Sequence, residues 1–403
     1  MGKKPVSAAY VLGVGLTKFI KPRGKVDYTE LGFEAGVKAL LDAQINYDDV
    51  DQGVACYCYG DSTCGQRVFY QFGMTQIPIY NVNNNCSTGS TGLHMARNMV
   101  GHGMADCVMV HGASENDFAE IARINHLHSA KNPYSQFRDV YTLDQILSSP
   151  TIHSPLTKLQ CCPTSDGGAS AIIVSEDFLN ARPHLRSQAI QIAGQHLATD
   201  RPDLFDRSAI NLMGFGMTQH AARTALAEAE VDPKDVRVCE LHDCFSANEM
   251  ITLDALGLCD PGKAHEMVRA GDITYGGRCV VNPSGGLISK GHPLGATGIA
   301  QCAELVWQLR GWANNRLVED TKVALQHNLG LGGAAVVTVY KRADGKTNEV
   351  VRDQEVKSKT WVGYNPAVEA KGFTKAQVDQ VRSKKSRSEW ALQDTEKKVE
   401  ARF

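Results

Sequence analysis

Short apolar runs alternate with longer amphipathic runs along the first hundred residues. Residues 8–15 form an apolar run of strand length, and residues 27–44 carry apolar side chains at the spacing of one helix face. Residues 77–82 repeat the strand pattern, and residues 93–100 repeat the helix pattern. Strands that alternate with helices are typical of an α/β fold, which is the fold class that the pattern predicts.

The polar turn between residues 77–82 and 93–100 is centred on Cys86. A cysteine at the start of a helix faces unpaired backbone N–H groups and the positive end of the helix dipole, and both favour the nucleophilic thiolate. Gly89 and Gly92 leave the first helical turns without side chains, so we expect a substrate to approach them closely. The alternative is a buried structural cysteine, which is the commoner role for one cysteine among twelve.

The sequence also contains an internal repeat. Three segments of the first half align, in the same order, with three segments of the second half: 33–51 with 219–237, 86–92 with 292–298, and 167–174 with 332–339. This duplication predicts two halves, residues 1–180 and 181–341, each built on a mixed sheet with alternating helices. If the halves pack about a pseudo-twofold axis, equivalent turns face each other, and Cys86 lies near His292.

Two regions have no counterpart in the other half. Between Gly112 and Asp166 the first half holds about 41 additional residues, and this polar segment (about 113–165) predicts a surface excursion and a candidate lid. Residues 342–403 form a charged C-terminal extension. We interpret this extension as a solvated linker or docking arm, with an amphipathic helix over residues 373–398 as the alternative.

Composition narrows the range of functions. The 403 residues are 43% hydrophobic, and the net charge of −2 gives no general attraction to nucleic acid. No run is long enough to span a membrane, and the N-terminus has no apolar stretch of the secretory kind. Twelve cysteines, several within apolar runs, indicate a reducing compartment. Cys56, Cys58 and Cys64 have no cysteine pair or histidine at zinc spacing, so no metal site is expected.

Four small polar clusters follow strand-like runs and carry the candidate chemistry. They are Asn84-Asn85-Cys86-Ser87, His242-Asp243-Cys244-Phe245, Gly291-His292-Pro293 and His327-Asn328-Leu329-Gly330. A cysteine beside a histidine is the minimum for covalent acyl transfer, because an unperturbed thiol is only a few per cent ionised near neutral pH. Cys244 can act as a second acid or base, and His242 can donate a hydrogen bond to an oxyanion. Taken singly, His242, His327 and Asn328 are equally consistent with structural polar groups.

The combination of motifs resembles the thiolase superfamily. The residues that carry the resemblance are Asn85-Cys86-Ser87-Thr88-Gly89, His242-Asp243-Cys244-Phe245, Asn282-Pro283-Ser284-Gly285-Gly286, Gly291-His292-Pro293-Leu294-Gly295-Ala296-Thr297-Gly298 and Asn328-Leu329-Gly330. The His-Asp-Cys-Phe block is similar to the sterol-carrier-protein type of peroxisomal 3-oxoacyl-CoA thiolase, whereas ordinary thiolases carry Asn-Glu-Ala-Phe there. The resemblance runs from about Val11 to Tyr340, with a shorter loop region than is usual in the family.

The resemblance implies a fold, a reaction and a set of roles. The fold is two duplicated mixed-sheet halves of βαβαβ type in an αβαβα layered sandwich. The reaction is thiolytic cleavage of a long or branched 3-oxoacyl-CoA, in which His292 deprotonates Cys86 and Cys86 carries the acyl group. His242 holds the enolate oxygen, Cys244 is the acid and base at the substrate carbon, and the Cys86 and Gly330 amides stabilise the oxyanion of acyl transfer. Substrate-binding roles fall on three further residues: Ser284, Gly285 and Asn328.

The resemblance also implies partners and a location. CoA is a co-substrate, acyl-CoA is the other partner, and no permanently bound cofactor is expected. The family forms homodimers or tetramers, and residues 77–85 are a candidate partner-facing edge. Peroxisomal residence follows from the resemblance alone, since Ala401-Arg402-Phe403 is not a peroxisomal signal, and the cytoplasm or mitochondrion are the alternatives. Two other functions stay open: a non-catalytic acyl-CoA-binding or lipid-binding protein, and a condensing or aldol enzyme on the same fold.

Overall fold

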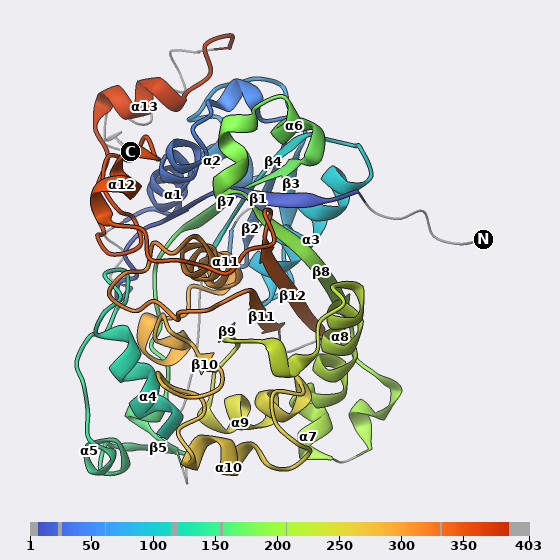
Figure 1. Ribbon diagram of the computed structural model, residues 1–403, viewed down its shortest axis with the longest axis vertical. Coiled ribbons are helices and arrows are strands. Elements are labelled where there is room, and N and C mark those ends of the chain that lie inside the picture. Colours follow the sequence, from blue (N-terminus) through green and yellow to red (C-terminus); the bar gives the residue numbers. More distant parts are fainter. Residues whose placement is uncertain are drawn as a thin grey trace.

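A computed structural model describes residues 7–22, 26–60, 62–113, 120–153, 156–206, 208–330 and 333–386. Ten of its strands join in one hydrogen-bonded order, β10-β9-β11-β12-β8-β1-β7-β4-β2-β3 (Figure 1). The first half contributes β1 (Ala9–Leu16), β2 (Gln52–Tyr57), β3 (Ile79–Val82), β4 (Cys107–Ala113) and β7 (Ala169–Ser175). The second half contributes β8 (Ile190–Ala198), β9 (Val238–Glu240), β10 (Val280–Val281), β11 (Val323–Gly330) and β12 (Ala334–Arg342).

The strand order is the same in both halves when it is read outward from the centre. β1 is followed by β7, β4, β2 and β3, and β8 is followed by β12, β11, β9 and β10. Equivalent pairs also share their direction, because the inner two pairings are antiparallel and the outer two are parallel. The two halves of the described sheet join at β1 and β8, which pair Tyr10 with Gln191 and Val11 with Ile190. The duplication in the sequence is therefore a duplication of the fold.

Helices complete five layers. The larger helices are α1 (Tyr28–Ala43), α2 (Cys64–Phe69), α3 (Thr88–Gly101), α8 (Phe215–Glu228), α9 (Ser246–Ala255), α10 (Ala264–Arg269) and α11 (Leu294–Arg310), and the short ones include α6 (Glu176–Asn180) and α7 (Ala209–Leu212). α3 and α11 pack against each other and against strands of both halves, while α1 covers β1 and β7, and α8 covers β8 and β12 (Figure 1). The expected αβαβα arrangement is confirmed. None of the described helices is long and apolar enough to cross a membrane.

The glycines shared by the two halves bring the central helices together. A Cβ on Gly89 would lie 2.4 Å from the carbonyl oxygen of Gly295, and a Cβ on Gly298 would lie 2.5 Å from the backbone nitrogen of Ser90. Gly92 is likewise buried, against Cys56 and Val110. The expectation that Gly89 and Gly92 open the helix to substrate is therefore wrong: Gly89 allows α3 to pack closely on α11, and Gly92 allows α3 to pack closely on the sheet.

The excursion after β4 is more buried than its polar composition suggests. It holds α4 (Glu120–Ser129), α5 (Leu143–Leu147) and a small hairpin of β5 (Thr151–His153) and β6 (Leu156–Thr157). α4 packs against the π-helical turn Gly286–Lys290, where Phe137 and Gln136 donate backbone hydrogen bonds to the carbonyls of Ser289 and Lys290. The surface excursion is thus also a structural support for the segment that leads to His292.

The C-terminal extension packs on both halves as far as residue 386: Val351 donates to the Gly311 carbonyl of the second half, and Ser383 donates to the Phe72 carbonyl of the first. It carries α12 (Asp353–Ser358) and α13 (Lys375–Val381), and α13 lies beside α1 (Figure 1). Val378 and Val381 join the core cluster that contains Leu41 and Phe72. The interpretation as a solvated linker or docking arm is therefore wrong for residues 342–386. The alternative of a helix over residues 373–398 holds for Lys375–Val381 alone within the described part, and residues 387–398 lie outside that part.

Candidate active site

Cys86 lies on the turn between β3 and α3, two residues before the first helical residue, Thr88. Asn85 has a φ of +47°, a left-handed conformation that is uncommon outside glycine. The turn is held by hydrogen bonds from the Ser87 backbone nitrogen to the Asn84 carbonyl (3.1 Å) and from the Thr88 hydroxyl to the Asn85 carbonyl (2.6 Å). Cys86 is only partly buried.

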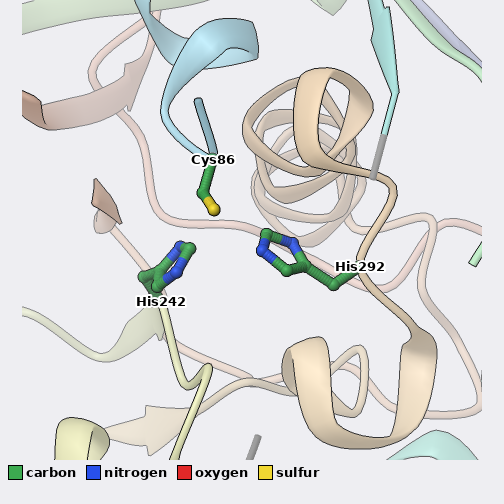
Figure 2. A group of neighbouring side chains, drawn as sticks. All are labelled: Cys86, His242 and His292. Atoms are coloured by element: carbon green, nitrogen blue, oxygen red, sulfur yellow. The ribbon is translucent and has the colours of Figure 1, made fainter. Parts of the chain in front are cut away.

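Two histidines from the other half meet this cysteine. The sulfur of Cys86 and one ring nitrogen each of His242 and His292 lie within 4.8 Å of one another. Figure 2 shows Cys86 approaching from the start of α3, while His242 and His292 approach from the segments after β9 and before α11. The two imidazole rings are perpendicular, with centroids 5.0 Å apart. The structure thus brings together three of the predicted catalytic residues.

The hydrogen bonds of His292 leave one ring nitrogen available. Its Nδ1 lies 2.6 Å from the hydroxyl oxygen of Thr297, and that hydroxyl donates its own proton to the Pro293 carbonyl. Nδ1 is therefore the protonated nitrogen of His292, and Nε2 carries a lone pair. Nε2 is buried and has no hydrogen-bond partner among the described residues. Burial lowers the pKa of His292 well below its usual value, and His242 and Lys290 lower it further, so the ring is neutral and can accept a proton.

His242 has the opposite arrangement of protons. The Asn328 side-chain nitrogen donates to Nδ1 of His242 at 3.0 Å, so the ring proton is on Nε2. The backbone nitrogen of His242 donates to Nδ1 of His327 at 3.4 Å, and Nε2 of His327 lies 3.1 Å from the Thr218 hydroxyl. Burial is the main cause that lowers the pKa of His242 well below its usual value. A neutral His242 is therefore a hydrogen-bond donor, whereas His292 is an acceptor.

Thr297, Thr218 and His327 contribute to this arrangement, and sequence reasoning gave none of them a role in the site. Thr297 had a signal, because it coincides with Thr91 in the internal repeat. His327 belonged to a candidate cluster without a stated role, and the structure shows it as a buried part of β11, where burial lowers its pKa to about 3. No feature of the local sequence distinguishes Thr218 from the other polar residues of α8.

Gly330 lies beside the Cys86 turn, and Cys244 follows His242 in the chain. A Cβ on Gly330 would be 2.4 Å from the Asn84 carbonyl oxygen and 3.1 Å from the Ser87 nitrogen, so the end of β11 touches the Cys86 turn. Cys244 is buried two residues after His242, just before α9. It is not a member of the group of three ligand atoms around Cys86. The roles of Gly330 and Cys244 stay predictions.

Ser284 and Gly285 lie in a buried polar network rather than in the cluster. The Ser284 hydroxyl donates to Glu240 at 2.8 Å, and the Lys290 ammonium contacts both Glu240 (3.0 Å) and Ser284 (2.7 Å). A Cβ on Gly285 would be 2.4 Å from the Cβ of Ser129 in α4. The polar groups of Ser284 are thus engaged within the protein, and direct contact of either residue with substrate stays a prediction.

A pair of buried carboxyl groups lies behind the cluster. The Asn125 side-chain nitrogen donates to Asp243 at 2.9 Å and to Glu249 at 3.2 Å. Burial raises the pKa of Asp243 to about 7, and burial together with Asp243 raises the pKa of Glu249 well above its usual value. Asp243 also accepts backbone hydrogen bonds from Leu287 and Ile288, so this pair connects the His242–Cys244 segment to the segment before His292.

Comparisons with known proteins identify the family of this chain. Residues 201–342 match the thiolase C-terminal domain-like family. Sterol carrier protein 2 of Oryctolagus cuniculus is 49% identical over an alignment that covers 84% of this chain and 72% of that protein. The chain belongs to the thiolase family, in its sterol-carrier-protein type. The human mitochondrial 3-ketoacyl-CoA thiolase in complex with CoA shares the fold with a TM-score of 0.65 and 16% identity, covering 83% of this chain and 98% of that chain. The Ltp2-ChsH2(DUF35) aldolase also shares it, with a TM-score of 0.73 and 22% identity over 84% of this chain and 98% of that chain.

The family assignment confirms the resemblance drawn from the motifs. This assignment gives the chain a function of the 3-oxoacyl-CoA thiolase family. The two structural neighbours have different activities on one fold, so the reaction of this chain has to be argued from its own residues.

Proposed function

We propose that this chain cleaves 3-oxoacyl-CoA with CoA through an acyl group carried on Cys86. The observation that supports this most directly is the cluster of one sulfur and two neutral imidazoles within 4.8 Å. The two rings have complementary proton arrangements, one accepting and one donating. A nucleophile beside a base, with a donor at the developing negative charge, is what covalent acyl transfer requires.

The first half of the reaction uses all three residues. Nε2 of His292 takes the proton from Cys86, and the thiolate attacks the 3-oxo carbon of the substrate. The bond between C2 and C3 then breaks and leaves an acyl group on the sulfur. The enolate oxygen of the departing acyl-CoA accepts hydrogen bonds from Nε2 of His242 and from the now protonated His292, and Cys244 gives its proton to C2.

The second half regenerates the cysteine. The Cys244 thiolate takes the proton of a CoA thiol, and the CoA sulfur attacks the acyl carbon. The backbone N–H groups of Cys86 and Gly330 stabilise the tetrahedral oxyanion, which is consistent with the contact between the end of β11 and the Cys86 turn. Collapse of this intermediate breaks the bond between the acyl carbon and the Cys86 sulfur and releases the shortened acyl-CoA, and the Cys86 thiolate takes back the proton held by His292.

The finer assignments follow the family. We propose long or branched 3-oxoacyl chains as substrates, peroxisomal residence, and a homodimer formed through the partly exposed edge strand β3. We also propose that residues 1–180 and residues 181–341 are the two domains of the chain.

Mass spectrometry of the intact chain after brief incubation with a 3-oxoacyl-CoA tests the reaction. We expect an acyl adduct on Cys86 that disappears when CoA is added, and no adduct in Cys86→Ser. Cys58→Ser is the matched control, since the Cys58 sulfur contacts the Asn85 carbonyl at 3.1 Å but is not in the cluster, and it should keep the adduct. A CoA ester bound to an unmodified wild-type chain would instead support a non-catalytic binding protein.

A further inference from the structure

We propose that Cys86, His242 and His292 also form a binding site for a soft divalent cation such as Zn²⁺, and that the bound ion inhibits the chain. The three ligand atoms lie within 4.8 Å of one another, and the two imidazoles are buried. This combination of one sulfur and two nitrogens is the donor set that zinc prefers, whereas Mg²⁺ and Ca²⁺ prefer oxygen.

The separations are close to those of a zinc site. With Zn–N bonds of about 2.0 Å and a Zn–S bond of about 2.3 Å, tetrahedral ligands lie roughly 3.5 Å apart. The cluster therefore has to contract by about 1 Å, and the partly exposed Cys86 side chain is the member with room to move. Three protein ligands leave the fourth position for water or an incoming thiol.

His292 is already arranged as a ligand. A metal-bound histidine usually donates its second ring N–H to a fixed acceptor, which orients the ring. Nδ1 of His292 has such an acceptor in the Thr297 hydroxyl at 2.6 Å. Its Nε2 is fully buried and has no partner within the described part of the chain, and in Figure 2 the ring points toward Cys86 and His242. This unsatisfied lone pair is the observation that points to a ligand.

Asn328 decides whether His242 can join. In the observed orientation the Asn328 nitrogen donates to Nδ1 of His242, so Nε2 carries the proton and cannot bind a metal. The Asn328 oxygen is buried without a partner among the described residues. Rotation of this amide by half a turn directs the oxygen to Nδ1, which then carries the proton and leaves a lone pair on Nε2. One orientation of Asn328 therefore suits the thiolase reaction, and the other suits metal binding.

The bound ion prevents the thiolase reaction because it occupies the sulfur and nitrogen atoms that the reaction uses. Binding forms one bond to sulfur and two to nitrogen, and it releases the Cys86 proton to solvent. The His292 lone pair is then no longer free to take a proton, and the His242 N–H is no longer available to the enolate. Metal binding itself needs no substrate, so it can be measured whether or not the chain proves to be a thiolase.

Titration of the metal-free chain with Co²⁺, followed by displacement with Zn²⁺, tests the proposal without any acyl-CoA. We expect one ion per chain, a thiolate-to-cobalt charge-transfer band, and release of about one proton per ion. Cys86→Ser should abolish the band, and His292→Gln should weaken binding at least about tenfold. Cys58→Ser should bind as the wild type does. A charge-transfer band that survives Cys86→Ser, or its absence from the folded wild-type chain, would overturn the proposal.

Asn328→Asp separates this site from adventitious binding to surface cysteines. A carboxylate can only accept the Nδ1 proton of His242, so the variant should bind Co²⁺ more tightly than the wild type by about tenfold or more. Circular dichroism checks that the variant is folded. Unchanged or weaker binding by folded Asn328→Asp would contradict the part assigned to the amide.

Discussion

His242 and His292 are chemically alike and equally buried, yet their neighbours give them opposite proton arrangements. Thr297 accepts the Nδ1 proton of His292, and Asn328 donates to Nδ1 of His242. A hydroxyl and an amide outside the cluster thus determine which ring is the base and which is the donor. Since burial keeps both rings neutral, this difference does not depend on an ordinary histidine ionisation near neutral pH.

Thr297→Val tests this dependence for His292. Valine keeps the volume of the side chain but removes the acceptor for Nδ1, so the ring loses its orientation and its preferred tautomer. We expect the rate of Cys86 acylation to fall about 10–100-fold. Rapid-quench mass spectrometry measures that rate.

Thr321→Val is the control for this prediction. Thr321 is also a buried threonine, and its hydroxyl donates to the Val318 carbonyl in a separate part of the fold. Both variants should lose about 1 kcal/mol of unfolding free energy, but only Thr297→Val should slow acylation. Equal rates in the two variants would show that Thr297 has a structural role alone.

At the scale of elements, the site depends on the close packing of α3 and α11. Cys86 precedes α3 and His292 precedes α11, so the separation of the two helices sets the separation of the two side chains. Gly89 and Gly298 permit this approach, because a Cβ at either position would meet backbone atoms of the other helix.

Gly89→Ala should therefore destabilise the chain and disturb the site together. The added methyl group meets the Gly295 carbonyl at 2.4 Å, which is a contact that requires the helices to separate. We expect a loss of about 1–3 kcal/mol in the unfolding free energy, measured by urea denaturation, and slower alkylation of Cys86. Gly372→Ala, where a Cβ meets nothing within 4 Å, should change stability by less than about 1 kcal/mol. Equal stabilities of the two variants would contradict the packing role.

The elements of the two halves could be predicted because the sequence repeats its glycines and threonine at equivalent positions. The packing of the extension and the excursion could not, because their charged and polar composition suggested solvent exposure. Their polar groups are in fact used internally, as where the Arg382 guanidinium donates to the Gln71 carbonyl and lies 5.3 Å above the ring of Phe33. Composition alone does not show whether a polar side chain has a partner within the fold.

The residues of the site could be predicted from the sequence, but the positions of their protons could not. The residue types and the meeting of Cys86 with two histidines follow from the motifs and the duplication, whereas proton positions depend on Thr297 and Asn328 in three dimensions. The same applies to the hydrogen bond of the Ser284 hydroxyl to Glu240, which the motif did not indicate.

At the scale of the whole molecule, buried histidines couple stability to pH. Burial lowers the pKa of six of the described histidines, to about 4 for three of them and to about 3 for His327. The unfolded chain therefore binds protons below about pH 6.5 that the folded chain does not bind. Asp243 and Glu249 act in the opposite direction, because their raised pKa values keep them protonated in the folded chain. The pKa values of Asp42, Asp166 and Glu240 are raised by burial as well, so six histidines outweigh five carboxyl groups by about one proton.

We therefore expect the unfolding free energy to fall as the pH is lowered from about 6.5 toward 4, by about 1.4 kcal/mol per pH unit for the one net proton. Urea denaturation at a series of pH values measures this slope. His128→Asn should reduce the slope by about 1.4 kcal/mol per pH unit, because burial lowers the pKa of His128 to about 4 and asparagine cannot titrate. A stability that is constant or rises on acidification would contradict the prediction.

The join between the halves has a consequence of its own. Two residue pairs connect β1 to β8 in the described sheet. The Cys86 sulfur belongs to the first half, and its proton acceptor, His292, belongs to the second half. A displacement of about 1 Å between the two halves is enough to lower the reactivity of the Cys86 thiol roughly a hundredfold. Such a displacement is too small to expose core residues to solvent. The rate at which an alkylating reagent labels Cys86 therefore reports how accurately the two halves of the chain are positioned against each other. It detects small displacements of the halves that do not change the melting temperature.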